Sequence, residues 1–311
     1  MASKTSKPSK PAVDVYQDIT DRIVEALEAG TVPWRKPWKS LSGFGPTRLD
    51  GGKEYQGVNT LLLSVAAFAG GYSSIYWGTY KQISERGGQV RAKQKSTQIV
   101  FAKTVVKKGK DGADDETFRM LRFYSVFNVE QADWPEGSKL PAEPQITEAD
   151  YVEPIEKAER IVAGMPSAPR IQHGGDRAFY SPALDYIGMP PTAAFDSTEG
   201  YYATLFHEMG HSTGHAKRLD RGLTGAFASH SYGREELVAE MTAAFLSADA
   251  GIADQTFDNS ASYLASWIKT IKEDPKSIVW AAGRAQKAAD LILDRDPAAE
   301  STDDDETKEA A

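Results

Sequence analysis

Residues 202–211, YATLFHEMGH, restrict the possible folds of this chain more than any other segment. In a helix, His207 and His211 are one turn apart on the same face, so both imidazoles can bind one metal ion. Glu208 lies beside them, placed to accept a proton from metal-bound water. The chain has no cysteine, so histidines and carboxylates must supply every ligand. The segment therefore predicts a helix that holds Zn²⁺ or another divalent metal, completed by a ligand from elsewhere.

The surroundings of this segment favour a metal site over a structural pair of histidines. Three of the five histidines fall within residues 207–215, the flanking side chains are apolar, and an acidic helix is predicted downstream. The alternative is that the two histidines cap a helix or form satisfied polar contacts in the core, without any metal.

The third ligand separates the classes of zinc peptidase that share this motif. A metzincin requires a histidine where this chain has Lys217, which excludes that class. His215 remains a minor alternative, because a helix that ends at Gly214 would turn it away.

A glutamate on a second helix would make the site gluzincin-like, and the segment REELVAEMTAAFL supplies candidates. Glu236 and Glu240 share one helical face, so we expect Glu236 to bind the metal and Glu240 to orient a ligating histidine. The two roles could be reversed, or both acids could face solvent. Tyr232, together with His230 and Arg234 just before this helix, is a candidate donor to the oxyanion of a peptidase reaction. Residues 178–187 could provide an edge strand for an extended peptide.

Charge divides the chain into two unlike halves. The 311 residues carry a net charge of −8, but residues 1–140 have a net charge of +6 and the remainder −14. The length fits about two domains. We expect a disordered basic arm at 1–12, a first domain at 13–134, a Pro-rich linker at 135–150, a second domain at 151–293 and a disordered acidic tail at 294–311.

Periodicity predicts an α+β fold in both domains. In the first, helices are expected at 13–29, 57–68 and 79–85, followed by strands at 98–103, 104–107 and 118–128. In the second, a helix at 154–163 precedes strands at 170–172, 178–181 and 186–189, and helices follow at 198–213, 233–250, 260–272 and 276–293.

The first half interleaves cations with aromatic side chains, a pattern typical of surfaces that bind single-stranded nucleic acid. Cations can contact phosphates while flat rings stack on unpaired bases. The alternative is that the aromatic residues fill the core of a small domain. The candidate DNA-binding residues are Trp34, Arg35, Lys36, Trp38, Trp77, Tyr80, Lys81, Arg91, Lys93 and Lys95.

Several segments of the sequence resemble a known protein family. YQDITDRIVEALEAGTVPWRKPW, YQGVNTLLL, GYSSIYWGTYKQISERGGQVRAKQKSTQIVFAK and YSVFNVEQ resemble the N-terminal domain of ArdC-type antirestriction proteins, also found in some plasmid DNA primases. FDSTEGYYATLFHEMGHSTGHAKRLDR and YGREELVAEMTAAFL resemble the zincin-like metallopeptidase domain of the same family. The resemblance implies binding of single-stranded DNA without strong sequence preference, and a metal held by His207, His211 and a glutamate of the second helix, with Glu208 catalytic.

By this resemblance the protein would be an antirestriction protein of a plasmid or phage. It would protect incoming DNA by coating single strands, by disabling a host restriction or nuclease protein, or by both. The alternative is a non-catalytic single-strand-binding protein whose metal site is structural. A primase accessory module is less favoured, because the chain has no polymerase-like acidic motif. The longest apolar run, residues 61–69, is too short for a membrane helix, and no secretory signal begins the chain, so we expect a cytoplasmic protein.

Overall fold

The computed structural model describes residues 14–30, 32–33, 45–107, 116–144, 152–223, 230–252 and 261–295. The basic arm at 1–12, the part of the linker at 145–150 and the acidic tail from residue 296 lie outside this part of the chain. So do four candidate DNA-binding residues: Trp34, Arg35, Lys36 and Trp38.

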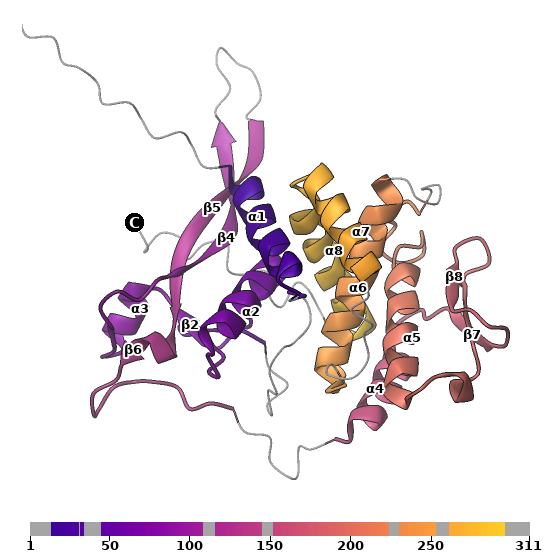
Figure 1. The fold of residues 1–311 in the computed structure, drawn as a ribbon, viewed down its shortest axis with the longest axis horizontal. Coiled ribbons are helices and arrows are strands. Elements are labelled where there is room, and N and C mark those ends of the chain that lie inside the picture. Colours follow the sequence, from indigo (N-terminus) through magenta and orange to yellow (C-terminus); the bar gives the residue numbers. More distant parts are fainter. Residues whose placement is uncertain are drawn as a thin grey trace, which may run out of the picture.

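Within the described residues, the N-terminal half consists of a mixed sheet, a separate two-stranded sheet and three α-helices (Figure 1). Its elements are α1 (Val15–Glu28), β1 (Thr47–Arg48), α2 (Val58–Gly70), β2 (Tyr76–Gly78), α3 (Tyr80–Glu85), β3 (Gln89–Val90), β4 (Thr97–Lys107), β5 (Glu116–Asn128), the 3-10 turn η1 (Val129–Gln131) and β6 (Ala132–Asp133). The main sheet has the order β1-β2-β5-β4, and β3 pairs with β6. The predicted helices match, but the two strands expected at 98–103 and 104–107 form the single strand β4, which pairs antiparallel with β5 along its whole length.

The C-terminal half places a small sheet beside a group of helices. Its elements are α4 (Pro154–Gly164), β7 (Arg170–His173), β8 (Phe179–Ser181), β9 (Tyr186–Met189), η2 (Thr192–Ala194), α5 (Thr198–Ser212), α6 (His230–Ala250), α7 (Ala261–Glu273) and α8 (Ser277–Ile292). The sheet order is β7-β9-β8, which leaves β8 at an edge. The expected α+β class is therefore confirmed, and the predicted elements match within a few residues. The exception that matters for the site is α6, which begins at His230 rather than Gly233.

Capping residues explain where the first helix and the HEMGH helix begin. The Asp14 carboxylate accepts hydrogen bonds from the amides of Tyr16 and Gln17 at the start of α1. The Ser197 hydroxyl accepts one from the amide of Gly200 at the start of α5. Both caps satisfy amides that have no partner within the helix.

One hydrophobic cluster crosses between the two halves of the chain. It joins Ile19, Ile23 and Leu27 of α1 to Leu237 and Met241 of α6, all buried. In Figure 1, α1 and α2 lie beside helices α7 and α8. The two halves therefore share part of their core.

Polar contacts run across the same boundary. The Thr20 hydroxyl donates to the carbonyl of Pro275 at 2.9 Å, and the amide of Gly57 donates to the side chain of Gln286 at 3.3 Å. Lys272 pairs with Glu28 at 2.7 Å.

No helix in the described part of the chain combines the length and apolar character that a membrane crossing requires.

The shared core predicts cooperative unfolding of the two halves. Ile23 is fully buried, so Ile23→Ala should lower the free energy of unfolding by about 2–4 kcal/mol. Hydrogen exchange should then accelerate in α6 as well as in α1. Phe68→Ala, at a half-exposed residue of α2, serves as the control and should change little. Unaltered exchange in α6 would show that the halves unfold independently.

Candidate functional site

Helices α5 and α6 pack closely at Gly210, the glycine of the HEMGH motif. A Cβ at this position would lie 3.1 Å from the Cα of Ala239 and 3.2 Å from the Cβ of Thr242. These distances are shorter than ordinary van der Waals contacts, so only glycine fits without a shift of one helix. The crossing brings the histidines of α5 next to the glutamates of α6.

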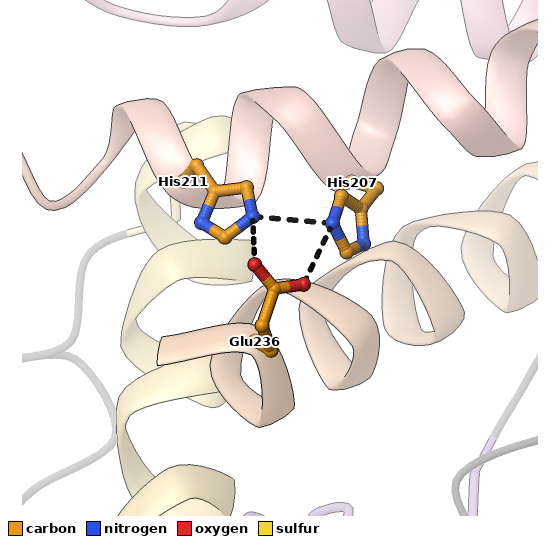
Figure 2. A group of neighbouring side chains, drawn as sticks. All are labelled: His207, His211 and Glu236. Carbon is orange, nitrogen blue, oxygen red and sulfur yellow. Dashed lines mark hydrogen bonds and ion pairs between the residues drawn. The ribbon is translucent and has the colours of Figure 1, made fainter. Parts of the chain in front are cut away.

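Three side chains from these helices converge on one point, as Figure 2 shows: His207, His211 and Glu236. The two Nε2 atoms are 3.1 Å apart, and each is 3.5 Å from an oxygen of the Glu236 carboxylate. With metal–ligand bonds of about 2.0–2.2 Å, tetrahedral ligand atoms are about 3.3–3.6 Å apart. Both imidazole–carboxylate distances fall in this range, and the distance between the two Nε2 atoms is about 0.2 Å below it. The chemistry and approximate spacing of these three groups therefore fit a zinc-type ion with one position left for water or substrate.

The opposite ring nitrogen of each histidine faces another carboxylate of α6. His207 Nδ1 lies 4.0 Å from Glu240, and His211 Nδ1 lies 3.8 Å from Glu235. A carboxylate there favours a proton on Nδ1 and leaves the Nε2 lone pair directed at the metal position.

The charges at this site favour a cation. Burial lowers the pKa of His211, but the carboxylates of Glu235 and Glu236 outweigh burial and raise that pKa to about 10. Burial raises the pKa of Glu236, but His207 and His211 outweigh it and hold that pKa below its ordinary range. A metal ion would take the place of the positive charge that the carboxylates stabilise.

Sequence reasoning missed three residues of this arrangement: Glu235, Arg221 and Gly210. Arg221 pairs with Glu235 and also donates to the carbonyl of Gly210 at 2.9 Å. The double glutamate at 235–236 was a visible signal. No sequence signal marked Arg221, because its contacts with Gly210 and Glu235 depend on how the segment after α5 packs against α5 and α6.

The other candidates on α5 lie as follows. Glu208 directly follows His207 and is buried. His215 does not belong to the group of His207, His211 and Glu236. Its Nδ1 lies 3.9 Å from Asp185 and accepts a hydrogen bond from the amide of Lys217 at 3.2 Å.

The proposed oxyanion donors lie on α6 rather than in a loop before it. His230 and Tyr232 belong to its first turn, and their side chains lie outside the described structure. Arg234 donates to the hydroxyl of Ser277 at 3.0 Å and pairs with Asp274. Its guanidinium therefore contacts Asp274, between α7 and α8, and Ser277 at the start of α8, rather than the histidines.

Five of the candidate DNA-binding residues are exposed on the described part of the N-terminal half: Tyr80, Lys81, Arg91, Lys93 and Lys95. Tyr80 is 52% exposed, and its hydroxyl accepts a hydrogen bond from Gln89 at 2.9 Å. Lys93 has a left-handed φ of 66°, and the carbonyl of Lys95 accepts from Gln131 at 2.9 Å. The contact with Gln131 attaches the loop that carries Lys93 and Lys95 to the 3-10 turn η1.

Trp77 and Arg91 have different surroundings. Trp77 is 1% exposed, so its ring lies in the core, where no base can reach it while the domain is folded. At this position the aromatic residue fills the core, which was the alternative interpretation. Arg91 is exposed, but it donates to the carbonyls of Glu130 and Ala132 and so ties the loop to β6.

Family comparisons match both halves of the chain. Residues 13–127 match the N-terminal domain of anti-restriction factor ArdC, and residues 156–284 match a zincin-like metallopeptidase domain. Protein y4eC of Sinorhizobium fredii (strain NBRC 101917 / NGR234) is 38% identical over 297 residues, which cover 93% of this chain and 94% of y4eC. DNA primase TraC of Escherichia coli is also 38% identical, over 89% of this chain but only 27% of the primase.

Two solved structures share the fold. Both are crystal structures of the antirestriction ArdC protein from plasmid R388, one metal-free and one Mn(II)-bound, and each superposes with a TM-score of 0.72. They are 38% and 39% identical to this chain. The similarity covers 91% of this chain in both cases, and 97% and 98% of the two ArdC chains.

The close crossing at Gly210 predicts that Gly210→Ala weakens metal binding without removing a ligand. The added methyl should push α5 and α6 apart by a few tenths of an ångström, with a loss of about tenfold in Mn²⁺ or Zn²⁺ affinity by calorimetry. Gly283→Ala in α8, where a methyl meets nothing within 4 Å, controls for the gain in helix propensity. Equal affinities in the two variants would contradict the packing argument.

Proposed function

The chain belongs to the ArdC family of antirestriction proteins and carries that family's zincin-like domain, and on this premise we propose that it binds single-stranded DNA and hydrolyses a peptide bond with a metal bound in its C-terminal half. The proposed ligands are His207, His211 and Glu236. The proposed target is a host restriction or nuclease protein.

The observation that carries the peptidase proposal is the convergence of two imidazoles and one carboxylate at distances of 3.1–3.5 Å, close to tetrahedral spacing, with Glu208 next in the chain to His207. A structural metal site is closed by four protein ligands, whereas a catalytic site leaves one position open. Three ligands are found here within the described residues. Three ligands rather than four favour a catalytic metal site over a structural one.

Each residue of the candidate site has a distinct proposed role in peptide hydrolysis. A metal held by this set would polarise a substrate carbonyl and make water more acidic. Glu208 would accept the proton of the attacking water and pass it to the leaving amine. Glu240 and Glu235 would keep the two imidazoles oriented. Strand β8, at the edge of its sheet, offers backbone groups to an extended peptide.

Exposed lysine side chains and an exposed tyrosine ring on the N-terminal half support the DNA-binding proposal. Lys81, Lys93 and Lys95 supply exposed positive charge on the same half of the chain as the exposed ring of Tyr80, and binding to phosphates and unpaired bases requires both kinds of group. Trp34, Arg35, Lys36 and Trp38 remain proposed contacts on sequence grounds.

Glu208→Gln tests whether the site is catalytic. Removing a general base costs about 10²–10⁴-fold in rate, so the variant should lose protection of incoming DNA in a transfer assay while it keeps its metal. His207→Ala should lose both protection and metal, and should keep single-strand affinity nearly unchanged.

Full protection by Glu208→Gln would instead mean that the metal is structural and that DNA coating suffices. The full chain is needed for this comparison, because removing the C-terminal half would expose the apolar face of α1.

The DNA surface is tested by the double variant Lys93→Ala/Lys95→Ala. Each phosphate contact on a single strand contributes about 0.7 to the slope of log affinity against log salt, so the slope should fall by about 1.4. Lys217→Ala/Lys269→Ala removes two exposed lysines of the C-terminal half and should leave the slope unchanged. Identical slopes for the two double variants would place the DNA elsewhere.

A further inference from the structure

A buried arginine, Arg221, closes the end of the helix that carries both histidines. Its side chain is 4% exposed. Nη2 donates to the carbonyl of Gly210 at 2.9 Å, and Nη1 donates to the hydroxyl of Thr213 at 2.6 Å. The last carbonyls of a helix have no partner within it, so this contact holds the C-terminal turn of α5 in place.

The same guanidinium binds a carboxylate of α6 through two nitrogens. Nη2 lies 2.5 Å from one oxygen of Glu235, and Nε lies 3.1 Å from the other. A two-point contact of this kind fixes the orientation of the carboxylate as well as its position. Arg221 therefore joins the two helices that supply the candidate ligands.

Glu235 connects Arg221 to the candidate metal site. Its Oε1, the oxygen that Arg221 Nη2 contacts, lies 3.8 Å from Nδ1 of His211. The Nε2 of His211 is directed at His207 and Glu236. A carboxylate held on the Nδ1 side selects the tautomer in which Nε2 is free to bind a cation.

We propose that Arg221 is a positioning residue of the metal centre, which acts by holding Glu235 against His211. This inference rests on the proposed role of His211 as a metal ligand. Neither Arg221 nor Glu235 is a ligand in this arrangement. Glu235 lies one contact beyond the proposed ligand His211, and Arg221 lies one contact beyond Glu235. Together they determine how firmly the His211 imidazole is held toward the cation.

A second arginine nearby provides a matched comparison. Arg218 is 1% exposed, donates to the carbonyl of Ser212 at 2.7 Å at the same end of α5, and pairs with Asp185. It also donates to the hydroxyl of Tyr180 at 3.1 Å. Its carboxylate partner faces His215, which is outside the group of candidate ligands. Arg218 therefore shares the burial and the helix contact of Arg221 without its link to the metal site.

The experiment compares full-length Arg221→Lys and Glu235→Gln with Arg218→Lys, after chelation and re-addition of Zn²⁺ or Mn²⁺. Lysine keeps the charge but loses the two-point contact. We expect Arg221→Lys and Glu235→Gln each to lower metal affinity by about 10–100-fold, and Co²⁺ substitution to give an altered visible spectrum. Arg218→Lys should lower the stability of the metal-free protein but change metal affinity by less than about threefold.

A double variant sharpens the test. If Arg221 acts through Glu235, Arg221→Lys/Glu235→Gln should bind metal about as tightly as the weaker single variant. Equal effects of Arg221→Lys and Arg218→Lys on affinity, or additive losses in the double variant, would overturn the inference. Should Arg221→Lys fail to fold, Glu235→Gln with wild-type metal affinity and spectrum would overturn it as well.

The outcomes separate this inference from the proposed function. Wild-type affinity in Arg221→Lys and Glu235→Gln, with binding abolished in His207→Ala, would remove the positioning role alone. Metal binding that persists unchanged in His207→Ala would remove the proposed site, and with it the inference.

Discussion

The candidate site depends on how closely α5 and α6 approach each other. Imidazoles and carboxylates reach only a few ångströms from their helices, so a shared metal position requires the two axes to cross at short distance. Gly210 allows this, because any side chain there would meet the backbone of Ala239. Arg221 adds a polar link across the same crossing, from the carbonyl of Gly210 to the carboxylate of Glu235.

Helix α6 has a second function in the fold, because it packs on both halves of the chain. Leu237 and Met241 belong to the cluster that includes α1, whereas Ala243 and Leu246 belong to the cluster under α4 and the small sheet. The helix that carries Glu236 is therefore held from two sides. A ligand on such a helix loses little freedom when a metal binds, which favours affinity.

Much of the architecture could be read from the sequence because it depends on local rules. Apolar periodicity and caps located the helices within a few residues, and β-branched and aromatic runs located the strands. The division of β4 into two strands was wrong, since continuous pairing with β5 carries the chain through residues 103–104. The start of α6 was placed three residues late, and Arg234, expected just before the helix that carries Glu236, lies within it. That arginine instead contacts Ser277 and Asp274, which local sequence does not reveal.

The sequence by itself determined the chemistry available to this protein. Without cysteine, two histidines one turn apart and a downstream acidic helix were the credible metal donors, and the charge asymmetry located the basic half. Tertiary structure decided which groups meet. The helical period places Glu236 and Glu240 on one face, and only the offset of the α5–α6 crossing brings Glu236 between the Nε2 atoms and leaves Glu240 on the Nδ1 side of His207. It likewise put Trp77 in the core and Tyr80 at the surface, and brought Arg221 to Glu235. These outcomes depend on distances between segments far apart in the chain, which packing fixes and local sequence patterns do not encode.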